Sequence, residues 1–289
     1  MNLRQYPADR IRNVGLFGHG GAGKTSLAEA LLFDTKATTR LGRVEEGNTV
    51  TDYDPDEIKR GISVSAALAP VEWQVWRLAE ERGIPRLLFI NKMDRENADF
   101  GRALASARAA FGNAVAPIQF PVGSEKQFRG VVDLLTEQAH CYSDGTSGEF
   151  SSGPIPDELK EDEELYRRQL VESIAEQDEE LMMRYLEDEP IATEELATGL
   201  KQCVADGVVV PVLVGSAALN RGVPQLLDAI VDLLPSAVEA KATGTLNGSE
   251  VDVTPDTGGP TVALAFKTMA DPHVGRVTYL RVFSGSIKS

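Results

Sequence analysis

The sequence is poor in the residues that build disulfides and metal clusters: it has two cysteines and three histidines among 289 residues. Cys141 and Cys203 are too few for a disulfide framework or a cysteine metal cluster, and we interpret both as packed thiols. The histidines, His19, His140 and His273, are too scattered for a metal site.

Long apolar runs are also missing. No run approaches the roughly twenty residues that cross a membrane, and residues 1–12 lack the apolar core of a signal peptide. The composition, 42% hydrophobic and 25% charged, is that of an ordinary globular chain. We therefore expect a cytoplasmic monomer with no membrane partner.

Positive charge is in short supply, and the net charge is −15. The segment 157–195, called the acidic segment below, holds sixteen acidic and four basic residues, a net of −12. One interpretation is a solvated helical face; the other is a docking surface for a basic partner. Such a chain is a poor non-specific binder of nucleic acid, although shape-specific contact with a ribonucleoprotein stays open.

Glycine is concentrated near the N-terminus, where Gly18–Thr25 (the phosphate loop) fits the pattern G-x-x-x-x-G-K-[ST]. Val14–Phe17 before it predicts a buried strand, and Ser26–Leu32 after it predicts a helix. Strand, loop and helix are the setting in which this pattern binds nucleotide phosphates. The predicted phosphate-binding residues are Gly18, His19, Gly20, Gly21, Ala22, Gly23, Lys24, Thr25 and Ser26.

The chemistry follows from the residue types. The glycines let backbone N–H groups turn toward phosphates, at a helix N-terminus that favours anions. Lys24 would reach the β- and γ-phosphates, and the hydroxyl of Thr25 would bind Mg²⁺. His19 is expected to be a loop side chain without an acid–base role.

A polar loop follows, and its Ser63 presents a hydroxyl that could close over the γ-phosphate and Mg²⁺. Val64–Trp73 then predicts a strand, and Gln74–Arg82, stopped by Gly83, a helix.

The next strand, Arg86–Ile90, leads into Asn91-Lys92-Met93-Asp94, and ligands of open α/β sheets lie at such strand ends. The carboxylate of Asp94 can accept two hydrogen bonds from N1–H and the amine of guanine, which adenine cannot supply. The stem of Lys92 can lie along the base. Asn91, Lys92 and Asp94 are therefore predicted to bind a guanine base.

A further strand, Val208–Val214, precedes Gly215, Ser216 and Ala217, and a helix is predicted over Pro224–Leu234. Small residues after the strand allow close approach to a ligand. We predict that Ser216 and Ala217 complete the base site, with the Ala217 N–H reading the guanine carbonyl.

The region between these parts, 112–207, is interpreted as an insertion. It contains the strand-like pieces Pro117–Val122 and Val131–Leu134, a loop over Ser143–Pro156 and two or three acidic helices. Beyond the nucleotide domain, Thr243–Gly259 is expected to be a polar linker. Thr261–Ser289 alternates like β-strands around a turn at Asp271-Pro272-His273.

These residues together resemble elongation factor G of the translational GTPases, and more closely its elongation factor G-like paralogues, which carry the GHGGAGKT loop. The resemblance runs through the insertion as well, at Gly130–Leu134 and Glu179–Leu186. It continues at Asn220–Val223, Leu234–Ser236, Phe266–Lys267 and Asp271–Arg276.

The resemblance implies an α/β fold: a P-loop GTPase domain with an inserted α+β subdomain, followed by the start of a β-barrel domain. The expected divisions are 1–111 and 208–242 for the two parts of the GTP-binding domain, 112–207 for the insertion and 258–289 for the truncated barrel. It also implies GTP or GDP and Mg²⁺ as cofactors, GTP hydrolysis, and GTP-dependent movement of tRNA and mRNA. The implied partner is the ribosome, through rRNA and stalk proteins, with the insertion facing the stalk.

The sequence departs from the family in three places. Ser63 stands where the family has a Mg²⁺-binding Thr, and Gly21 replaces a common Asp. The Asp-Thr-Pro-Gly segment is missing, because Trp73 runs straight into Gln74. The missing piece corresponds to about 40–50 residues, including two strands that flank Val14–Phe17 in the family, so the backbone of that run has no evident partners.

The sequence therefore predicts a GTP-binding translation factor of the elongation factor G type, internally deleted and C-terminally truncated. Thr25 and Ser63 are its predicted Mg²⁺ ligands, and no residue is predicted to be a catalytic base. One alternative is a fragment that cannot hydrolyse GTP and binds a partner through its acidic insertion. Another is an ATP-dependent P-loop enzyme, which Asn91–Asp94 argues against.

Overall fold

The computed structural model describes residues 6–51, 72–187, 189–240, 242–271 and 275–287. The chain divides into two compact units, one of Gly15–Leu234 and one that combines Met1–Val14 with Pro235–Ser289. Short 3₁₀ helices are η1 (Ala8–Arg10), η2 (Val44–Glu46), η3 (Glu125–Gln127) and η4 (Asp157–Leu159).

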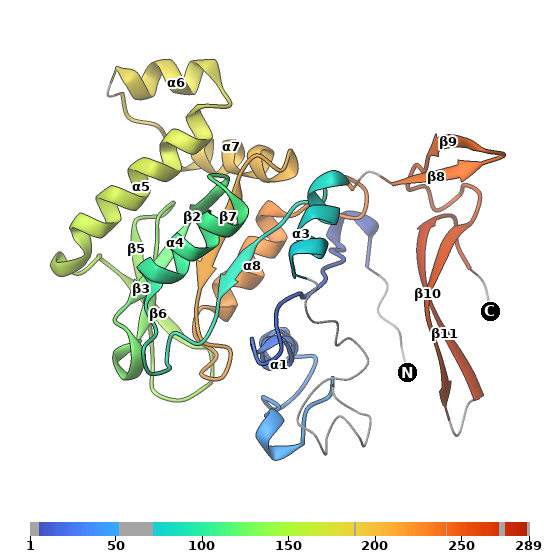
Figure 1. Ribbon diagram of the computed structural model, residues 1–289, viewed down its shortest axis with the longest axis horizontal. Coiled ribbons are helices and arrows are strands. Elements are labelled where there is room, and N and C mark those ends of the chain that lie inside the picture. The colour runs from blue at the N-terminus through green and yellow to red at the C-terminus, as the bar shows by residue number, and fades with distance from the viewer. Residues whose placement is uncertain (1–5, 52–71, 188, 241, 272–274, 288–289) are drawn as a thin grey trace. The chain divides into compact units, whose positions relative to one another are not determined.

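A three-stranded parallel sheet joins distant parts of the larger unit (Figure 1). Its order is β1 (Leu88–Ile90), β7 (Val210–Val214) and β2 (Val115–Pro117). Every residue of β7 is buried, as expected of an apolar strand between two parallel neighbours. The strands predicted over Arg86–Ile90 and Val208–Val214 are confirmed, although each is shorter at its start.

Helices of this part of the unit are α1 (Lys24–Asp34), α3 (Glu72–Glu81), α4 (Phe100–Phe111) and α8 (Val223–Leu233). The helix α4 starts where the carboxylate of Asp99 accepts a hydrogen bond from the Arg102 N–H at 2.8 Å, an N-cap. In α8 the first turn carries Pro224, which suits a helix start because its missing N–H would be unpaired there. The helices predicted over Ser26–Leu32 and Pro224–Leu234 are confirmed.

The helix predicted over Gln74–Arg82 is α3, which begins earlier, at Glu72. Trp73, predicted to end a strand, is helical, so that part of the strand prediction is wrong. A helix needs only its own backbone for hydrogen bonds, whereas a strand needs a neighbour. The rest of the predicted strand, residues 64–71, lies outside the described residues.

The predicted strand at Val14–Phe17 is also wrong. These residues are not in a strand, and the side chains of Val14 and Phe17 are 44% and 70% exposed. Among the described strands, none pairs with this run. The apolar residues have the composition of a strand but lack the neighbours that would bury them.

An antiparallel sheet follows β2, in the order β3 (Gln119–Val122), β4 (Gly130–Asp133), β5 (Gln138–Tyr142) and β6 (Phe150–Gly153). The strand-like pieces predicted at Pro117–Val122 and Val131–Leu134 correspond to β3 and β4, although Pro117 belongs to β2. The predicted loop at Ser143–Pro156 is partly wrong, because it contains β6. There Phe150 packs against the rings of His140 and Tyr142.

The acidic helices are α5 (Lys160–Ala175), α6 (Glu179–Leu186) and α7 (Thr193–Ala205). They confirm the prediction of two or three helices. One set of apolar residues of these helices is buried, whereas most of their acidic residues are exposed. The buried set includes Leu170, Ile174, Leu181, Leu196, Leu200 and Val204.

The smaller unit contains two hairpins, β8 (Thr243–Leu246) with β9 (Ser249–Asp252), and β10 (Val262–Asp271) with β11 (Gly275–Ser284). The linker predicted at Thr243–Gly259 is wrong, since it holds the first hairpin. Asn247 and Gly248 turn the chain there with φ of 54° and 84°, the left-handed values of a tight hairpin turn. The second hairpin confirms the strands predicted over Thr261–Ser289, while Pro272 and His273 lie outside the described residues.

The carboxylate of Glu29, on α1, has no exposed surface. Its Oε1 accepts hydrogen bonds from the N–H of Val50 at 2.8 Å and from the N–H and hydroxyl of Thr51, each at 3.0 Å. A Cβ on Gly42 would collide with its Oε2. Glu29 therefore fastens the segment 42–51 to the helix that follows the phosphate loop.

Within the described residues, no helix has the length and apolar character that a membrane span requires. The same residues contain no group of three or more His, Cys, Asp or Glu side chains that could hold a metal ion.

Candidate nucleotide-binding site

The phosphate loop bends tightly before α1. Gly21 and Gly23 have φ of 80° and 94°, in the left-handed region that favours glycine. A Cβ on Gly23 would collide with Nδ2 of Asn91, whereas a Cβ on Gly20 or Gly21 would meet nothing within 4 Å. The loop is thus close-packed on its inner side and open above Gly20 and Gly21.

Lys24, the first residue of α1, folds back over this loop. Its ammonium donates to the carbonyl oxygens of Gly18 at 2.6 Å and His19 at 3.0 Å. Thr25 and Ser26 occupy the same first turn of the helix. The imidazole Nδ1 of His19 lies 2.8 Å from the carbonyl oxygen of Gly20 on the exposed side.

Asn91 follows β1 directly and touches two loops. Its Nδ2 donates to the carbonyl oxygen of Ala22 at 3.0 Å. Its Oδ1 accepts from the N–H of Ala217 at 2.9 Å and from the N–H of Lys92 at 2.8 Å. One side chain therefore connects the phosphate loop with the residues that follow β7.

Lys92 has a φ of 68° and directs its side chain toward the phosphate loop. Its ammonium donates to the carbonyl oxygen of Gly21 at 2.5 Å. Asp94 lies farther along, with its side chain 16% exposed and its Oδ2 3.6 Å from Nε of Arg95. The other oxygen, Oδ1, is buried and has no hydrogen-bond partner among the described residues.

The residues after β7 form a closed loop, Ser216–Arg221, called the base loop below. The N–H and carbonyl of Ser216 exchange hydrogen bonds with Arg221, at 2.8 and 3.0 Å. The Oγ of Ser216 accepts from the Leu219 N–H at 3.2 Å. Ser216 and Ala217 are both buried, so their backbone positions are fixed by packing as well as by hydrogen bonds.

The structure therefore brings the phosphate loop, Asn91, Lys92 and Ala217 into direct contact. It places Asp94 next along the chain, with an acceptor oxygen that has no partner in the described part of the chain. Ser63 lies outside the described residues, so Thr25 is the one predicted metal ligand whose position is described.

A cleft of about 450 Å³ adjoins Asn91 on the side of α4. Its lining includes Lys92, Met93, Arg95 and Arg102, whereas Asp94 does not line it. Because the proposed base-selecting carboxylate is not part of its wall, we do not assign this cleft to the base.

Sequence reasoning missed two buried polar residues near these loops, Glu29 and Asn220, each with no exposed surface. For Glu29 a signal existed, since a charged residue stands among the apolar positions Leu27 and Ala30 of a short helix. For Asn220 the contacts that matter come from distant segments and leave no local pattern.

Comparison with known proteins covers most of the chain. The family of the elongation factor Tu GTP binding domain matches residues 9–75 and 68–236. The two matches overlap around Trp73 and Gln74, where the sequence predicts a missing segment.

A crystal structure of a protein from Thermus thermophilus is also similar, with 29% sequence identity and a TM-score of 0.76. The match covers 92% of this chain and 44% of the Thermus chain, so this chain spans less than half of that protein's length. The chain belongs to the family of the elongation factor Tu GTP-binding domain, within its elongation factor G-like translational GTPases.

Proposed function

We propose that the chain binds GTP and GDP through the phosphate loop, Asn91–Asp94 and the base loop. The observation that carries this proposal is the bridge made by Asn91, which contacts Ala22 of the phosphate loop and Ala217 of the base loop. In a guanine nucleotide the phosphates and the base lie at opposite ends. A protein that binds both ends needs the two loops held at a fixed separation.

The phosphate end would be held by Gly18–Ser26. The open space above Gly20 and Gly21 suits phosphate oxygens, and the ammonium of Lys24 is positioned over the same loop. Thr25 and Ser63 would hold Mg²⁺, which when bound neutralises charge on the phosphate oxygens.

The base end would be held by Asp94, Lys92, Ser216 and Ala217. The buried Oδ1 of Asp94, which has no partner among the described residues, costs free energy until it accepts a hydrogen bond. Guanine supplies two N–H donors for one carboxylate. The Ala217 N–H would donate to the guanine carbonyl.

The biological role that we propose is a GTP-dependent step on the ribosome, translocation or a related step, in the cytoplasm. Its support is membership of the elongation factor G-like GTPases and the coverage of both units by the Thermus structure. On the same support we propose contacts with ribosomal RNA and with the stalk proteins. We also propose that the chain divides into residues 1–111, 112–207, 208–242 and 258–289.

We propose no catalytic base. In this sequence Trp73 and Gln74 are adjacent, and both lie in α3. The family segment that positions the attacking water would stand between them. Nucleotide binding is therefore the activity to test first, and hydrolysis second.

A titration with fluorescent GDP tests the proposal, followed by competition with unlabelled GTP and ATP. We expect GTP to displace the probe at far lower concentration than ATP does. Equal displacement by ATP would remove the guanine assignment, and absence of probe binding would remove nucleotide binding itself.

Asp94→Asn tests base selection more closely. An amide at this position offers one donor and one acceptor, which matches xanthine better than guanine. We expect preference to shift from GDP toward xanthosine diphosphate. Asp144→Asn, at an exposed loop position, is the matched control and should bind GDP like the unmodified chain.

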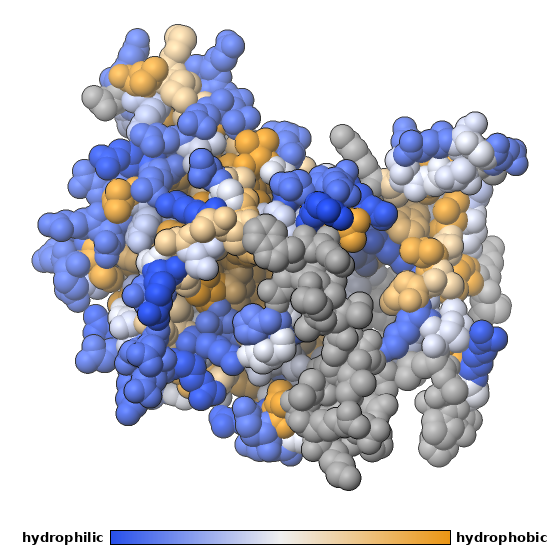
Figure 2. Space-filling view, in the orientation of Figure 1, coloured by the Kyte–Doolittle hydropathy of each residue, from blue (hydrophilic) through white to orange (hydrophobic). Residues whose placement is uncertain are grey.

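A second candidate function is docking of a basic partner on the acidic segment. Figure 2 shows a largely hydrophilic surface over α5 and α6, interrupted by apolar side chains. On α6 the side chains of Met183 and Leu186 are 63% and 73% exposed. Apolar residues ringed by acidic ones suit a partner with basic and apolar side chains.

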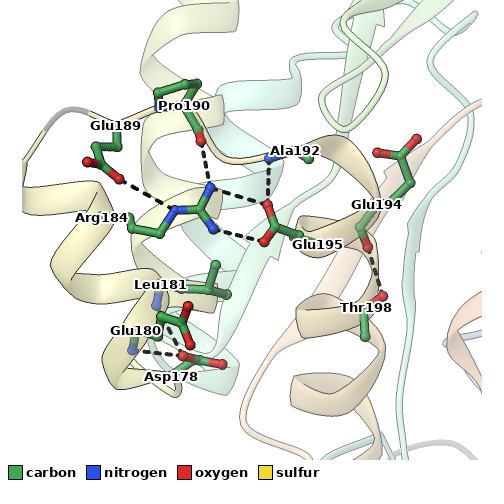
Figure 3. Close-up of polar contacts among 10 residues, drawn as sticks. All are labelled: Asp178, Glu180, Leu181, Arg184, Glu189, Pro190, Ala192, Glu194, Glu195 and Thr198. Atoms are coloured by element: carbon green, nitrogen blue, oxygen red, sulfur yellow. Dashed lines mark hydrogen bonds and ion pairs between the residues drawn. The ribbon is translucent and has the colours of Figure 1, made fainter.

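Some acidic side chains of the segment form hydrogen bonds and ion pairs within it (Figure 3). The carboxylate of Asp178 caps α6 by accepting from the N–H of Glu180 at 2.9 Å and of Leu181 at 3.1 Å. Arg184 donates to Glu195 at 2.8 Å, and this hydrogen bond lowers the pKa of Glu195. Asp178 therefore caps α6 and Glu195 connects α6 with α7, whereas the exposed Glu179 and Glu180 can face a partner.

Charge reversal tests docking. We expect Glu179→Lys with Glu180→Lys to weaken sedimentation of the chain with purified ribosomes, more at low than at high salt. The same reversals at Glu250 and Asp252, in the smaller unit, are the control. Ribosome binding without any GDP affinity would favour this second function over the first.

A further inference from the structure

Asn220, in the base loop, is a fully buried polar residue in the left-handed conformation, with a φ of 53°. Its Nδ2 donates to Oδ1 of Asp34 at 2.6 Å and lies 3.4 Å from the carbonyl oxygen of Thr146. Asp34 ends α1, and Thr146 belongs to the turn between β5 and β6. Three segments far apart in the sequence therefore meet at one amide.

The surroundings leave no room for another side chain. A Cβ on Gly148, which has a φ of 78°, would lie 2.7 Å from Nδ2 of Asn220 and 3.0 Å from Oδ1 of Asp34. The Oδ1 of Asn220 is buried and has no partner among the described residues. Burying a polar amide costs free energy that an apolar side chain would avoid, so stability is a weak reason for its presence.

The link from Asn220 to the nucleotide runs through its backbone. Its N–H donates to the carbonyl of Ala217 at 3.3 Å, closing a turn over residues 217–220. The next residue, Arg221, forms both hydrogen bonds to Ser216. A shift of Asn220 therefore moves Ala217, whose N–H we propose as the donor to the guanine carbonyl.

The helix α1 is thereby connected to both nucleotide loops. Its first residue, Lys24, belongs to the pattern of the phosphate loop, and its last residue, Asp34, accepts the hydrogen bond of Asn220. This connection is separate from the one that Asn91 makes, because it uses the far end of the base loop and the far end of α1. Together the two connections fix the distance between the phosphate loop and the base loop.

We propose that Asn220 is a positioning residue for guanine recognition: its buried hydrogen bond to Asp34 sets the base loop so that the Ala217 N–H meets the guanine carbonyl oxygen. The proposal rests on the proposed function, since it deepens the assignment of the base loop to guanine.

The test compares GDP with 6-thio-GDP on the full chain. The second nucleotide keeps both N–H donors for Asp94 but replaces the carbonyl oxygen with sulfur, a poor acceptor. We expect Asn220→Ala to lower GDP affinity roughly fivefold, the worth of one hydrogen bond, and to leave 6-thio-GDP affinity nearly unchanged. Asn113→Ala, at an exposed position, is the matched control.

A second pair of variants separates positioning from folding. Asn220→Asp alone places two carboxylates at a 2.6 Å contact and should lower GDP affinity further. Combined with Asp34→Asn, it exchanges donor and acceptor, and we expect GDP affinity to recover. A rescue of this kind does not follow from a general loss of packing.

Amide hydrogen exchange gives a readout that needs no nucleotide. We expect Asn220→Ala to speed exchange in residues 216–221 and not in β7. Equal loss of affinity for GDP and 6-thio-GDP, or unchanged exchange, would overturn the proposal. A wild-type chain without GDP affinity would overturn the proposed function instead, and exchange would still decide on the positioning role.

Discussion

The backbone N–H of Ala217 donates a hydrogen bond to Oδ1 of Asn91 at 2.9 Å. The same N–H is the donor that we propose for the guanine carbonyl. Nucleotide binding must therefore share or replace this hydrogen bond, whereas the hydrogen bond from Nδ2 of Asn91 to Ala22 does not involve that N–H. Asn91 thus supports the base loop through Oδ1 and the phosphate loop through Nδ2.

Asn91→Ala should remove both connections. We expect a loss of about 1–3 kcal/mol in the free energy of unfolding, because a half-buried amide with three hydrogen bonds disappears. GDP affinity should fall at least tenfold, as measured by fluorescence titration. Asn113→Ala should change neither quantity, and a chain with intact GDP affinity after Asn91→Ala would contradict the bridging role.

Lys92→Met tests the contact between its ammonium and the Gly21 carbonyl, 2.5 Å long. Methionine keeps most of the apolar stem that would lie along the base. We expect GDP affinity to fall about three- to tenfold, with stability nearly unchanged because the residue is exposed. Lys126→Met is the control, and an equal effect there would mean that general charge, not this contact, matters.

Glu29→Ala should be strongly destabilising. It leaves two N–H groups and one hydroxyl, from Val50 and Thr51, without their acceptor. We expect a loss of about 2–4 kcal/mol in urea unfolding. Glu29→Gln retains an acceptor oxygen and should lose less, whereas Glu45→Ala, on the exposed surface, should lose little. If Gln and Ala behave alike, the hydrogen bonds are not what stabilises the segment.

The pH dependence of stability should carry a contribution from Asp34. Burial raises the pKa of its carboxyl above 3.8, while the hydrogen bond from Asn220 acts in the opposite direction. The folded chain thus holds this proton more tightly than the unfolded chain. The stabilising contribution is complete below about pH 3.8 and is lost as pH rises through the raised folded pKa.

In Asp34→Asn, residue 34 cannot titrate, so this variant should not lose stability as the pH rises through the pKa of Asp34. Relative to the unmodified chain, its free energy of unfolding should therefore rise with pH across that window and then level off. Urea unfolding from about pH 4 to 8 measures the difference, with Asp144→Asn as control. Parallel curves for the two proteins would show that Asp34 is not the group responsible.

The sequence is a good guide where a local pattern decides the structure. The Val-rich run of β7 and the amphipathic pattern of α8 specify their elements without help from distant residues. The strand predicted at Val14–Phe17 is wrong because the apolar pattern says nothing about neighbours, and Phe17 is 70% exposed. By resemblance to the family, the two strands that would flank this run are missing from the sequence. Their absence indicates that the run has no neighbours, which the apolar pattern alone does not show.

Other parts of the structure are harder to predict from the sequence, for different reasons. The hairpin of β8 and β9 has a readable signal, Asn247-Gly248, which favours a two-residue turn. The contact of Asn220 with Asp34 has none, because 186 residues separate them. Contacts of that range depend on the packing of β7 beside β1, which a single sequence does not specify residue by residue.

Gly42 lies so close to the carboxylate of Glu29 that the residues tolerated at one position depend on the residue at the other. Any larger residue at 42 would strike the Glu29 side chain, so the first substitution there is harmful unless position 29 shortens as well. Glu29→Asp should accordingly relieve part of the cost of Gly42→Ala, since the backbone of Thr49, 3.1 Å from the added Cβ, must also shift. Either change alone is costly. Among related sequences, we expect these two positions to covary.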